Sequence, residues 1–352
     1  MKGKIEKFDS HKGIISHITL TNESGASVTL STLGAGIVSI KVPDAEGKLS
    51  DIVMGYKNPC DYIYDGPCCG KIPGRYANRI ARGLFSLNDK EYHLNVNCGP
   101  NHLHGGPEGI QNQNWLYAVD GEAGDVTFFL KSKDGDEYYP GNIEIRANYL
   151  WTENNELHLT LQAVTDADTI LNLTNHTYFC LSGHNAGNAL EHELQLFCSK
   201  YLDTDDSLAP TGKLLPVKGT PMDFTRSHPI KDRIKDDFKP LHIGKGYDHC
   251  WVADGFSEKA PKLNIIAILK DRNSGRQLQI DSTQPGVQVY TGNWLTGSPM
   301  GKDDYEYKDY DCVAIECQGL PDAPNHKNFP SQILRPGKEY YQQIIFRFTT
   351  LL

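Results

Sequence analysis

The chain has 352 residues, of which 39% are hydrophobic and 22% charged, and its formal net charge is −9. This composition is typical of a globular protein, and the acidic charge argues against nucleic-acid binding, because phosphate contacts need a basic surface. No apolar run approaches the roughly 20 residues of a membrane-spanning helix, and we expect no secretory signal after the basic first residues. Nine scattered cysteines without a C-x-x-C pair favour reduced thiols in a cytoplasmic protein over a zinc site.

Short runs that alternate apolar and polar residues follow one another along the chain, with turn residues between nearly all of them. The predicted strands are 13–20, 26–33, 36–42, 91–96, 126–131, 143–151, 157–164, 169–174, 190–197, 263–269, 286–291, 312–318 and 340–348. One short helix is predicted within 223–234. Many strands separated by turns predict a sandwich or a barrel. Because no linker, repeat or composition break divides the chain, we predict one domain over residues 1–352.

The strand predicted at 312–318 carries a carboxylate, Glu316, just before a Pro-rich turn at 319–326. Strict alternation places Glu316 on the face opposite Val313 and Ile315. Such a residue is either a solvated surface glutamate or a base held still over a cleft.

A second polar cluster, the strand-like run 174–179, favours the base. It contains His176 between Asn175 and Thr177. A lone histidine there would most often be a satisfied core residue, but purely structural strands rarely gather so many polar groups. A carboxylate and an imidazole held apart by a β scaffold suit general acid–base chemistry on a small polar substrate.

Two glycine-bounded clusters earlier in the chain offer further hydrogen-bonding groups. Residues 70–83 hold three arginines and Asn78, which suit vicinal hydroxyl groups or form a solvated basic loop. Residues 100–106 contain His102 and His104. This pair is interpreted first as an exposed polar turn, with a metal pair on an extended strand and a sugar-contacting pair as alternatives.

Two later clusters complete the set. Asp248 could accept hydrogen bonds from two ligand hydroxyls or cap a turn, and Gln288 shares a strand face with Tyr290. Trp251 and Trp294 are assigned to the core rather than to a surface on which a sugar stacks.

Taken in order, the motifs GRYANRIARG, NHLHGG, LTNHTYF, YDH, QPGVQVYTGN and ECQGLPDAPNH resemble the aldose 1-epimerase (galactose mutarotase) family. They span about residues 70 to 330, and the flanking strands fit the same fold. The resemblance implies one large β-sandwich (supersandwich) of long, twisted, mostly antiparallel sheets with few short helices. It also implies interconversion of the α and β anomers of free aldohexoses such as galactose and glucose, without a cofactor or a metal. The implied partner is a monosaccharide, and the implied state is a cytoplasmic monomer or weak homodimer.

The same resemblance assigns roles to individual residues. Glu316 becomes the catalytic base at the anomeric hydroxyl and His176 the catalytic acid at the ring oxygen, with pKa values that bracket neutral pH so that carboxylate and imidazolium coexist. The implied sugar-binding residues are Asn78, Arg79, His104, Tyr178, Asp248 and Gln288. Cys180 and Cys317 stand where the family often has Asn and Thr, which leaves every reacting group in place.

Three other functions stay open on the sequence. A glycoside hydrolase would use Asp248 and Glu316 as its carboxylate pair but gives His176 no role. A hexose-6-phosphate epimerase would gather Arg75, Arg79 and Arg82 around a phosphate. A non-catalytic sugar-binding module would need the polar groups but no base.

Overall fold

The computed structural model describes residues 1–187 and 189–351, and its strands form three main sheets in which every paired strand is antiparallel. The five-stranded sheet has the order β1 (Lys2–Ser10), β2 (Gly13–Thr21), β3 (Ser27–Ser31), β4 (Gly36–Pro43), β5 (Leu49–Asp51). The nine-stranded sheet has the order β10 (Leu116–Asp120), β11 (Asp125–Ser132), β12 (Ile143–Trp151), β13 (Glu156–Thr165), β26 (Tyr340–Thr350), β22 (Arg276–Ser282), β21 (Asn264–Lys270), β16 (Glu193–Leu196), β19 (His228–Pro229).

The six-stranded sheet has the order β15 (Tyr178–Phe179), β24 (Val313–Gln318), β23 (Gly286–Tyr290), β20 (Asp248–Val252), β17 (Lys200–Thr204), β18 (Pro210–Pro216). Three strand pairs lie outside these sheets: β14 (Thr169–Ile170) with β25 (Ile333–Leu334), β6 (Arg79–Ile80) with β9 (His102–Leu103), and β7 (Leu84–Leu87) with β8 (Lys90–His93).

The helices in the described part of the chain are short. They are α1 (Lys239–Gly244) and the 3₁₀ turns η1 (Pro59–Tyr62), η2 (Ala81–Gly83), η3 (Ile110–Asn112), η4 (Asp136–Tyr138), η5 (Ala189–Glu191), η6 (Ile230–Asp232), η7 (Lys302–Asp304) and η8 (Ala323–Asn325). Among the described residues, no helix is long and apolar enough to cross a membrane.

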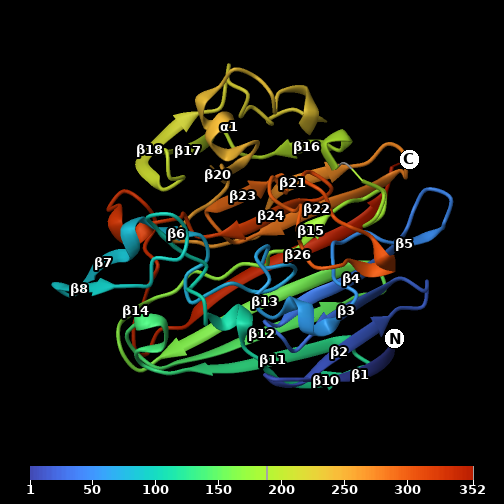
Figure 1. The fold of residues 1–352 in the computed structure, drawn as a ribbon, viewed down its shortest axis with the longest axis horizontal. Coiled ribbons are helices and arrows are strands. Elements are labelled where there is room, and N and C mark those ends of the chain that lie inside the picture. Colours follow the sequence, from blue (N-terminus) through green and yellow to red (C-terminus); the bar gives the residue numbers. More distant parts are fainter. Residues whose placement is uncertain (188, 352) are drawn as a thin grey trace.

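The sheets pack as a sandwich with the long nine-stranded sheet as one layer, which runs from β10 at the lower edge of Figure 1 to β16 near the top. The five- and six-stranded sheets form the other layer and are joined by a bridge between Val53 and Phe179. The hydroxyl of Tyr149 in β12 donates to the carbonyl of Ala35 (2.7 Å), and the ring of Phe346 in β26 lies 5.8 Å from that of Phe179. The predicted sandwich of antiparallel sheets is therefore confirmed.

Alternating burial explains why the strand predictions succeed. Along β13 the buried and half-buried side chains alternate, so one face enters the core, where each fully buried aliphatic side chain contributes about 1.5–3 kcal/mol. The ranges 143–151, 286–291 and 340–348 match β12, β23 and β26 to within two residues at each end.

Several elements differ from the sequence prediction. Of the short helix predicted within 223–234, only the 3₁₀ turn η6 is present, because Pro229 interrupts a longer helix and His228 pairs with Leu194 of β16 in β19. The strand predicted at 169–174 ends at Ile170, and the run predicted at 190–197 begins with the 3₁₀ turn η5. Several strands were not predicted from the sequence: β1, β10, β17, β18, β20 and β22.

Candidate active site

The six-stranded sheet supplies the floor of a cleft through the register of its strands. Glu316 on β24 lies directly opposite Gln288 on β23, and Tyr290 on β23 lies opposite Asp248 on β20. Cross-strand neighbours point to the same side of a sheet, and residues two apart on one strand do so as well. These four side chains therefore share one face.

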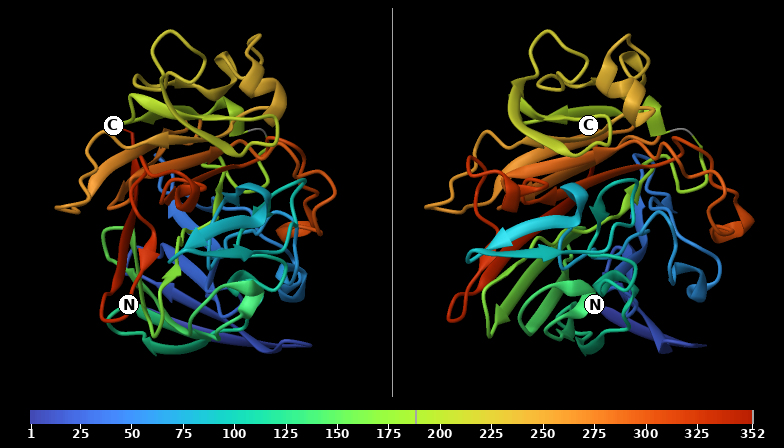
Figure 2. Two further views of the ribbon diagram at one scale, coloured as in Figure 1. Left: turned by 90° about the vertical axis from the view of Figure 1, so that its left-hand side faces the viewer. Right: turned by 60° about the vertical axis from the view of Figure 1, so that its left-hand side comes forward.

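The wall of the cleft comes from irregular segments. The segment that carries β6 and β9, cyan in Figures 1 and 2, supplies Asn78 and Arg79 before and within β6 and His104 just after β9. His176 precedes β15 and is bound through its backbone to the peptide of residues 70–71. Floor and wall enclose a cavity of about 500 Å³, and all eight residues predicted from the sequence line it: Asn78, Arg79, His104, His176, Tyr178, Asp248, Gln288 and Glu316.

Glu316 and His176 face each other at the bottom of this cavity. The Oε1 atom of Glu316 lies 3.5 Å from Nε2 of His176, and the two residues are 1% and 5% exposed. Among the described residues, Oε2 of Glu316 and Nδ1 of His176 have no hydrogen-bond partner. The solvated-glutamate interpretation is thus wrong, and His176 is not a fully satisfied core histidine. Buried polar atoms without partners mark a place where a ligand can supply them.

Burial shifts the pKa values of Glu316 and His176 in opposite directions. Desolvation raises the pKa of Glu316 well above its ordinary value, the charge of Asp248 raises it further, and Arg79 opposes the shift. Desolvation also lowers the pKa of His176 to about 4. Both shifts favour the uncharged forms, a protonated Glu316 beside a neutral His176. Burial opposes the expected coexistence of carboxylate and imidazolium, because removal from water penalises both charged forms.

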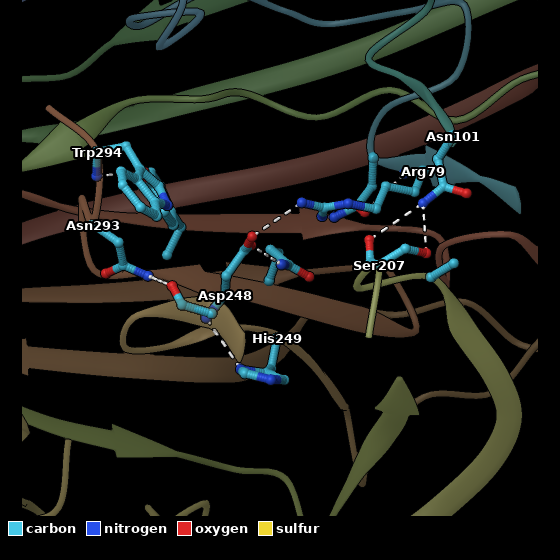
Figure 3. A network of polar contacts seen from close by, with 12 residues as sticks. Arg79, Asn101, Ser207, Asp248, His249, Asn293 and Trp294 are labelled. Atoms are coloured by element: carbon cyan, nitrogen blue, oxygen red, sulfur yellow. Dashed lines mark hydrogen bonds and ion pairs between the residues drawn. The ribbon is translucent and has the colours of Figure 1, made fainter. Parts of the chain in front are cut away.

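Asp248 joins the floor to the wall. Its Oδ2 atom lies 3.1 Å from Nη2 of Arg79, and its Oδ1 atom accepts a 2.6 Å hydrogen bond from Nε2 of Gln288. Figure 3 shows Asp248 between Arg79 and Trp294. Asp248 is therefore held by two long-range contacts rather than acting as a turn cap. The Nε atom of Arg79 is buried without a partner among the described residues and remains available to a ligand.

The arginine-rich segment is not a solvated basic loop, since Arg75 is 2% exposed and Arg79 8%. Arg75 donates to the hydroxyl of Ser132 and to the backbone carbonyls of Lys133, Pro140 and Gly141. These contacts fix the segment and occupy the guanidinium. Arg82 is exposed and does not line the cavity, so the three arginines do not converge on one anion.

His104 and His102 have separate environments. The Nδ1 atom of His104 accepts a hydrogen bond from the backbone N–H of Asn78 (3.1 Å), and burial lowers the pKa of His104 well below its ordinary value. The neutral ring then carries its proton on Nε2, as a donor. His102 is fully buried and bound to Tyr139 and Asn95.

The exposed-turn interpretation of this pair is therefore wrong. Across the described residues, no group of three or more His, Cys, Asp or Glu side chains could hold a metal ion. Close packing fixes the backbone after His104, because a Cβ on Gly105 would lie 1.8 Å from the carbonyl oxygen of Gly74.

One aromatic residue lies beside the Glu316–His176 pair, and another lies at the mouth of the cleft. Tyr178 donates to the carbonyl of Pro67 (2.9 Å), and its ring centroid lies 4.9 Å from that of His176. Trp251 is buried as predicted, but the core assignment of Trp294 is wrong: it is 66% exposed and lines the cavity, with Nζ of Lys245 4.0 Å from its ring. The Gly, Ser and Pro residues that follow Trp294 are the sequence signal for such a surface loop.

Comparison with known proteins agrees with the sequence motifs. The family model of aldose 1-epimerase matches residues 16–347. Mouse galactose mutarotase is 38% identical over 323 residues, covering 92% of this chain and 91% of its own length. Aldose 1-epimerase of Escherichia coli K12 is 33% identical over 333 residues, with 94% of each chain covered.

The fold agrees as well. The crystal structure of the GalM/aldose epimerase homologue from C. elegans superposes with a TM-score of 0.87 at 30% identity, over 96% of this chain and 99% of that one. The chain belongs to the aldose 1-epimerase family.

Proposed function

We propose that the chain interconverts the α and β anomers of free aldohexoses such as galactose and glucose by opening and reclosing the sugar ring. The observation that carries this proposal is the buried pair of Glu316 and His176, 3.5 Å apart at the bottom of a polar cleft, each with an atom that has no partner in the described part of the chain. The family membership and the names of the relatives support it.

Ring opening needs one proton removed from the anomeric hydroxyl and one delivered to the ring oxygen. Glu316 takes the first proton and His176 supplies the second, and reclosure on the other face of the aldehyde reverses both steps. The cycle requires one proton on the pair, shared between the carboxyl group of Glu316 and the imidazole of His176. The bound sugar stabilises the reactive form, because the anomeric O–H donates to the carboxylate while the ring oxygen accepts from the imidazolium.

The other polar groups hold the ring while the anomeric carbon moves. Arg79 offers its free Nε–H, His104 its Nε2–H, and Asp248 its remaining acceptor sites. Asn78, Tyr178 and Gln288 complete the polar lining. Such groups convert binding energy into orientation of the reacting atoms.

The alternatives fit the cleft less well. The arginines of residues 70–83 do not converge, which disfavours a phosphate-binding site. Asp248 is bound by Arg79 and Gln288, which disfavours Asp248 and Glu316 as a glycosidase pair. A glycosidase would also give His176 no role. A binding module would not need a buried base with an unpartnered oxygen.

We further infer that residues 1–352 form one domain, since a single hydrophobic cluster contains side chains from all three main sheets, among them Ile18, Leu159 and Val287. The proposed partner is a small carbohydrate. A monomeric or weakly dimeric state and a cytoplasmic location stay predictions.

Polarimetry on freshly dissolved α-D-galactose and α-D-glucose tests the proposal. The wild type should speed the approach to the same final rotation, and Glu316→Gln and His176→Gln should each slow it by about 10²–10⁴-fold. Glu339→Gln, a carboxylate outside the cleft, is the matched control. Sugar binding by Glu316→Gln should persist, measured as a change in tryptophan fluorescence. A nearly unchanged rate in Glu316→Gln would remove this residue as the base.

A further inference from the structure

A fully buried ion pair lies behind the wall of the cleft and has no part in the proton transfers. The side chains of Lys71 and Asp65 are 1% and 0% exposed, and Nζ lies 2.5 Å from Oδ1. Lys71 also donates to the carbonyl of Tyr62 (2.6 Å) and to Oδ1 of Asn112 (3.0 Å). The ammonium group thus holds the loop of residues 62–71 closed and ties it to the segment that contains Asn112.

The pair closes a loop at both ends. Lys71 binds the start of the loop at Tyr62, while Oδ2 of Asp65 accepts from the backbone N–H of Cys69 (2.7 Å) and from the hydroxyl of Tyr56 (3.0 Å). Between these contacts, Gly66 and Pro67 line the catalytic cavity. The loop that the ion pair fixes is therefore part of the cleft.

The same loop holds His176. The backbone N–H of His176 donates to the carbonyl of Lys71, and the N–H of Gly70 donates to the carbonyl of His176, both at 2.9 Å. The loop also accepts the hydroxyl of Tyr178 at Pro67, and the Tyr178 ring packs on the imidazole. Backbone and ring of the proposed acid are thus both bound to the segment 65–71.

We propose that Lys71 and Asp65 are positioning residues for His176: their ion pair fixes the 65–71 loop, which holds the imidazole against Glu316. A buried ion pair contributes little net stability compared with an apolar pair of similar volume, but it demands one geometry. The expected effect on kcat rests on the proposed function. The effect on the loop does not, because the loop geometry can be measured without substrate.

The test uses the double variant Asp65→Asn/Lys71→Met, since Lys71→Met alone would leave a buried carboxylate unpaired and endanger folding. We expect kcat for aldose mutarotation to fall by about tenfold to a hundredfold, as for a small displacement of a reacting group, with KM little changed. Amide hydrogen exchange at Gly70 and His176 should accelerate, while the amide of Ile344 in β26 stays protected.

A chemically matched control is Asp51→Asn/Lys302→Met. Lys302 also donates to a carboxylate, Asp51 Oδ2 (2.7 Å), and to two backbone carbonyls, but this pair lies outside the cleft. It should leave kcat unchanged, whatever its effect on thermal stability. In the Tyr178→Phe background, the loss caused by the Asp65/Lys71 variant should shrink, because part of the coupling passes through the Tyr178 hydroxyl.

The outcomes separate the two proposals. Unchanged kcat and unchanged exchange at His176 would overturn the positioning role, and so would an equal loss of kcat in the control pair. If the wild type does not accelerate mutarotation of any aldose, the proposed function fails, and the exchange of the His176 and Gly70 amides alone decides whether the ion pair fixes this loop.

Discussion

The floor and the wall of the cleft are built by different means. On the floor, Glu316 and Gln288 occupy paired positions of adjacent strands, so the backbone ladder of the sheet fixes their spacing. On the wall, His176 and His104 lie outside the regular ladders, and His104 and Asn78 have left-handed backbone angles. Their positions depend on buried polar side chains that bond to the backbone, such as Asn175, which donates to the carbonyl of Gly70 (2.8 Å).

The proposed base therefore lies on a strand, and the hydrogen-bond donors of the wall lie on irregular backbone. The strand holds the proposed base rigidly, because moving Glu316 would break the pairing of β24 with β23. Irregular backbone can bring several donors onto one sugar from directions that a sheet does not offer, and it requires many buried hydrogen bonds to stay in place. The predictions below test whether the two parts respond differently to change.

The largest effect is expected where the two parts meet. Asp248→Ala should leave the buried guanidinium of Arg79 unpaired and cost about 3–5 kcal/mol of the free energy of unfolding, because removal of one partner exposes the full desolvation penalty of the other. Urea denaturation measures this loss, and polarimetry should show a raised KM. The double variant Asp248→Ala/Arg79→Leu is the control and should recover part of the stability but not the sugar affinity.

The rate should depend on pH through one group of each part. Below pH about 4, His176 on the wall becomes protonated while Glu316 is also protonated, so the pair has no base left. Above the raised pKa of Glu316 on the floor, the pair loses its proton and no acid remains. The profile of kcat/KM should therefore be bell-shaped, falling about tenfold per pH unit outside the window. An alkaline limit near the ordinary pKa of a glutamate would contradict the burial of Glu316.

Ionisation of Glu316 on the floor should lower the free energy of unfolding. The raised pKa of Glu316 means that the folded state holds the proton more tightly than the unfolded state, so stability falls as pH rises from the ordinary glutamate value toward the raised one. Glu316→Gln removes this ionisation and should raise the Tm, more at pH 8 than at pH 5. Calorimetry at both pH values measures the difference, with Glu339→Gln as the control. An equal shift at both pH values would show that packing, not ionisation, is responsible.

The same contrast decides what the sequence could predict. Alternation in the strand containing Glu316 identifies its face, and the register that pairs it with Gln288 follows once the sheet forms. The wall segments stood out as polar clusters, but their roles came from motifs resembling a known family, since periodicity does not describe irregular backbone. The predicted strand at 169–174 stopped at Ile170 because the backbone of Asn172 bonds to Arg75 and Ala77 instead of continuing the ladder with β25. The pKa directions depend on burial, which alternation alone does not give.

The smallest effect is expected at the rim, which belongs to neither part. Trp294 is 66% exposed, whereas Trp115, Trp151 and Trp251 are buried, so most of the Trp294 ring is free to contact a ligand. Trp294→Ala should raise KM severalfold with kcat little changed, since roughly 1 kcal/mol of apolar contact is lost equally in ground and transition states. Trp294→Phe keeps a flat ring and should retain most of the affinity. A fall in kcat at unchanged KM would instead mean that Trp294 contacts the sugar only while the ring opens.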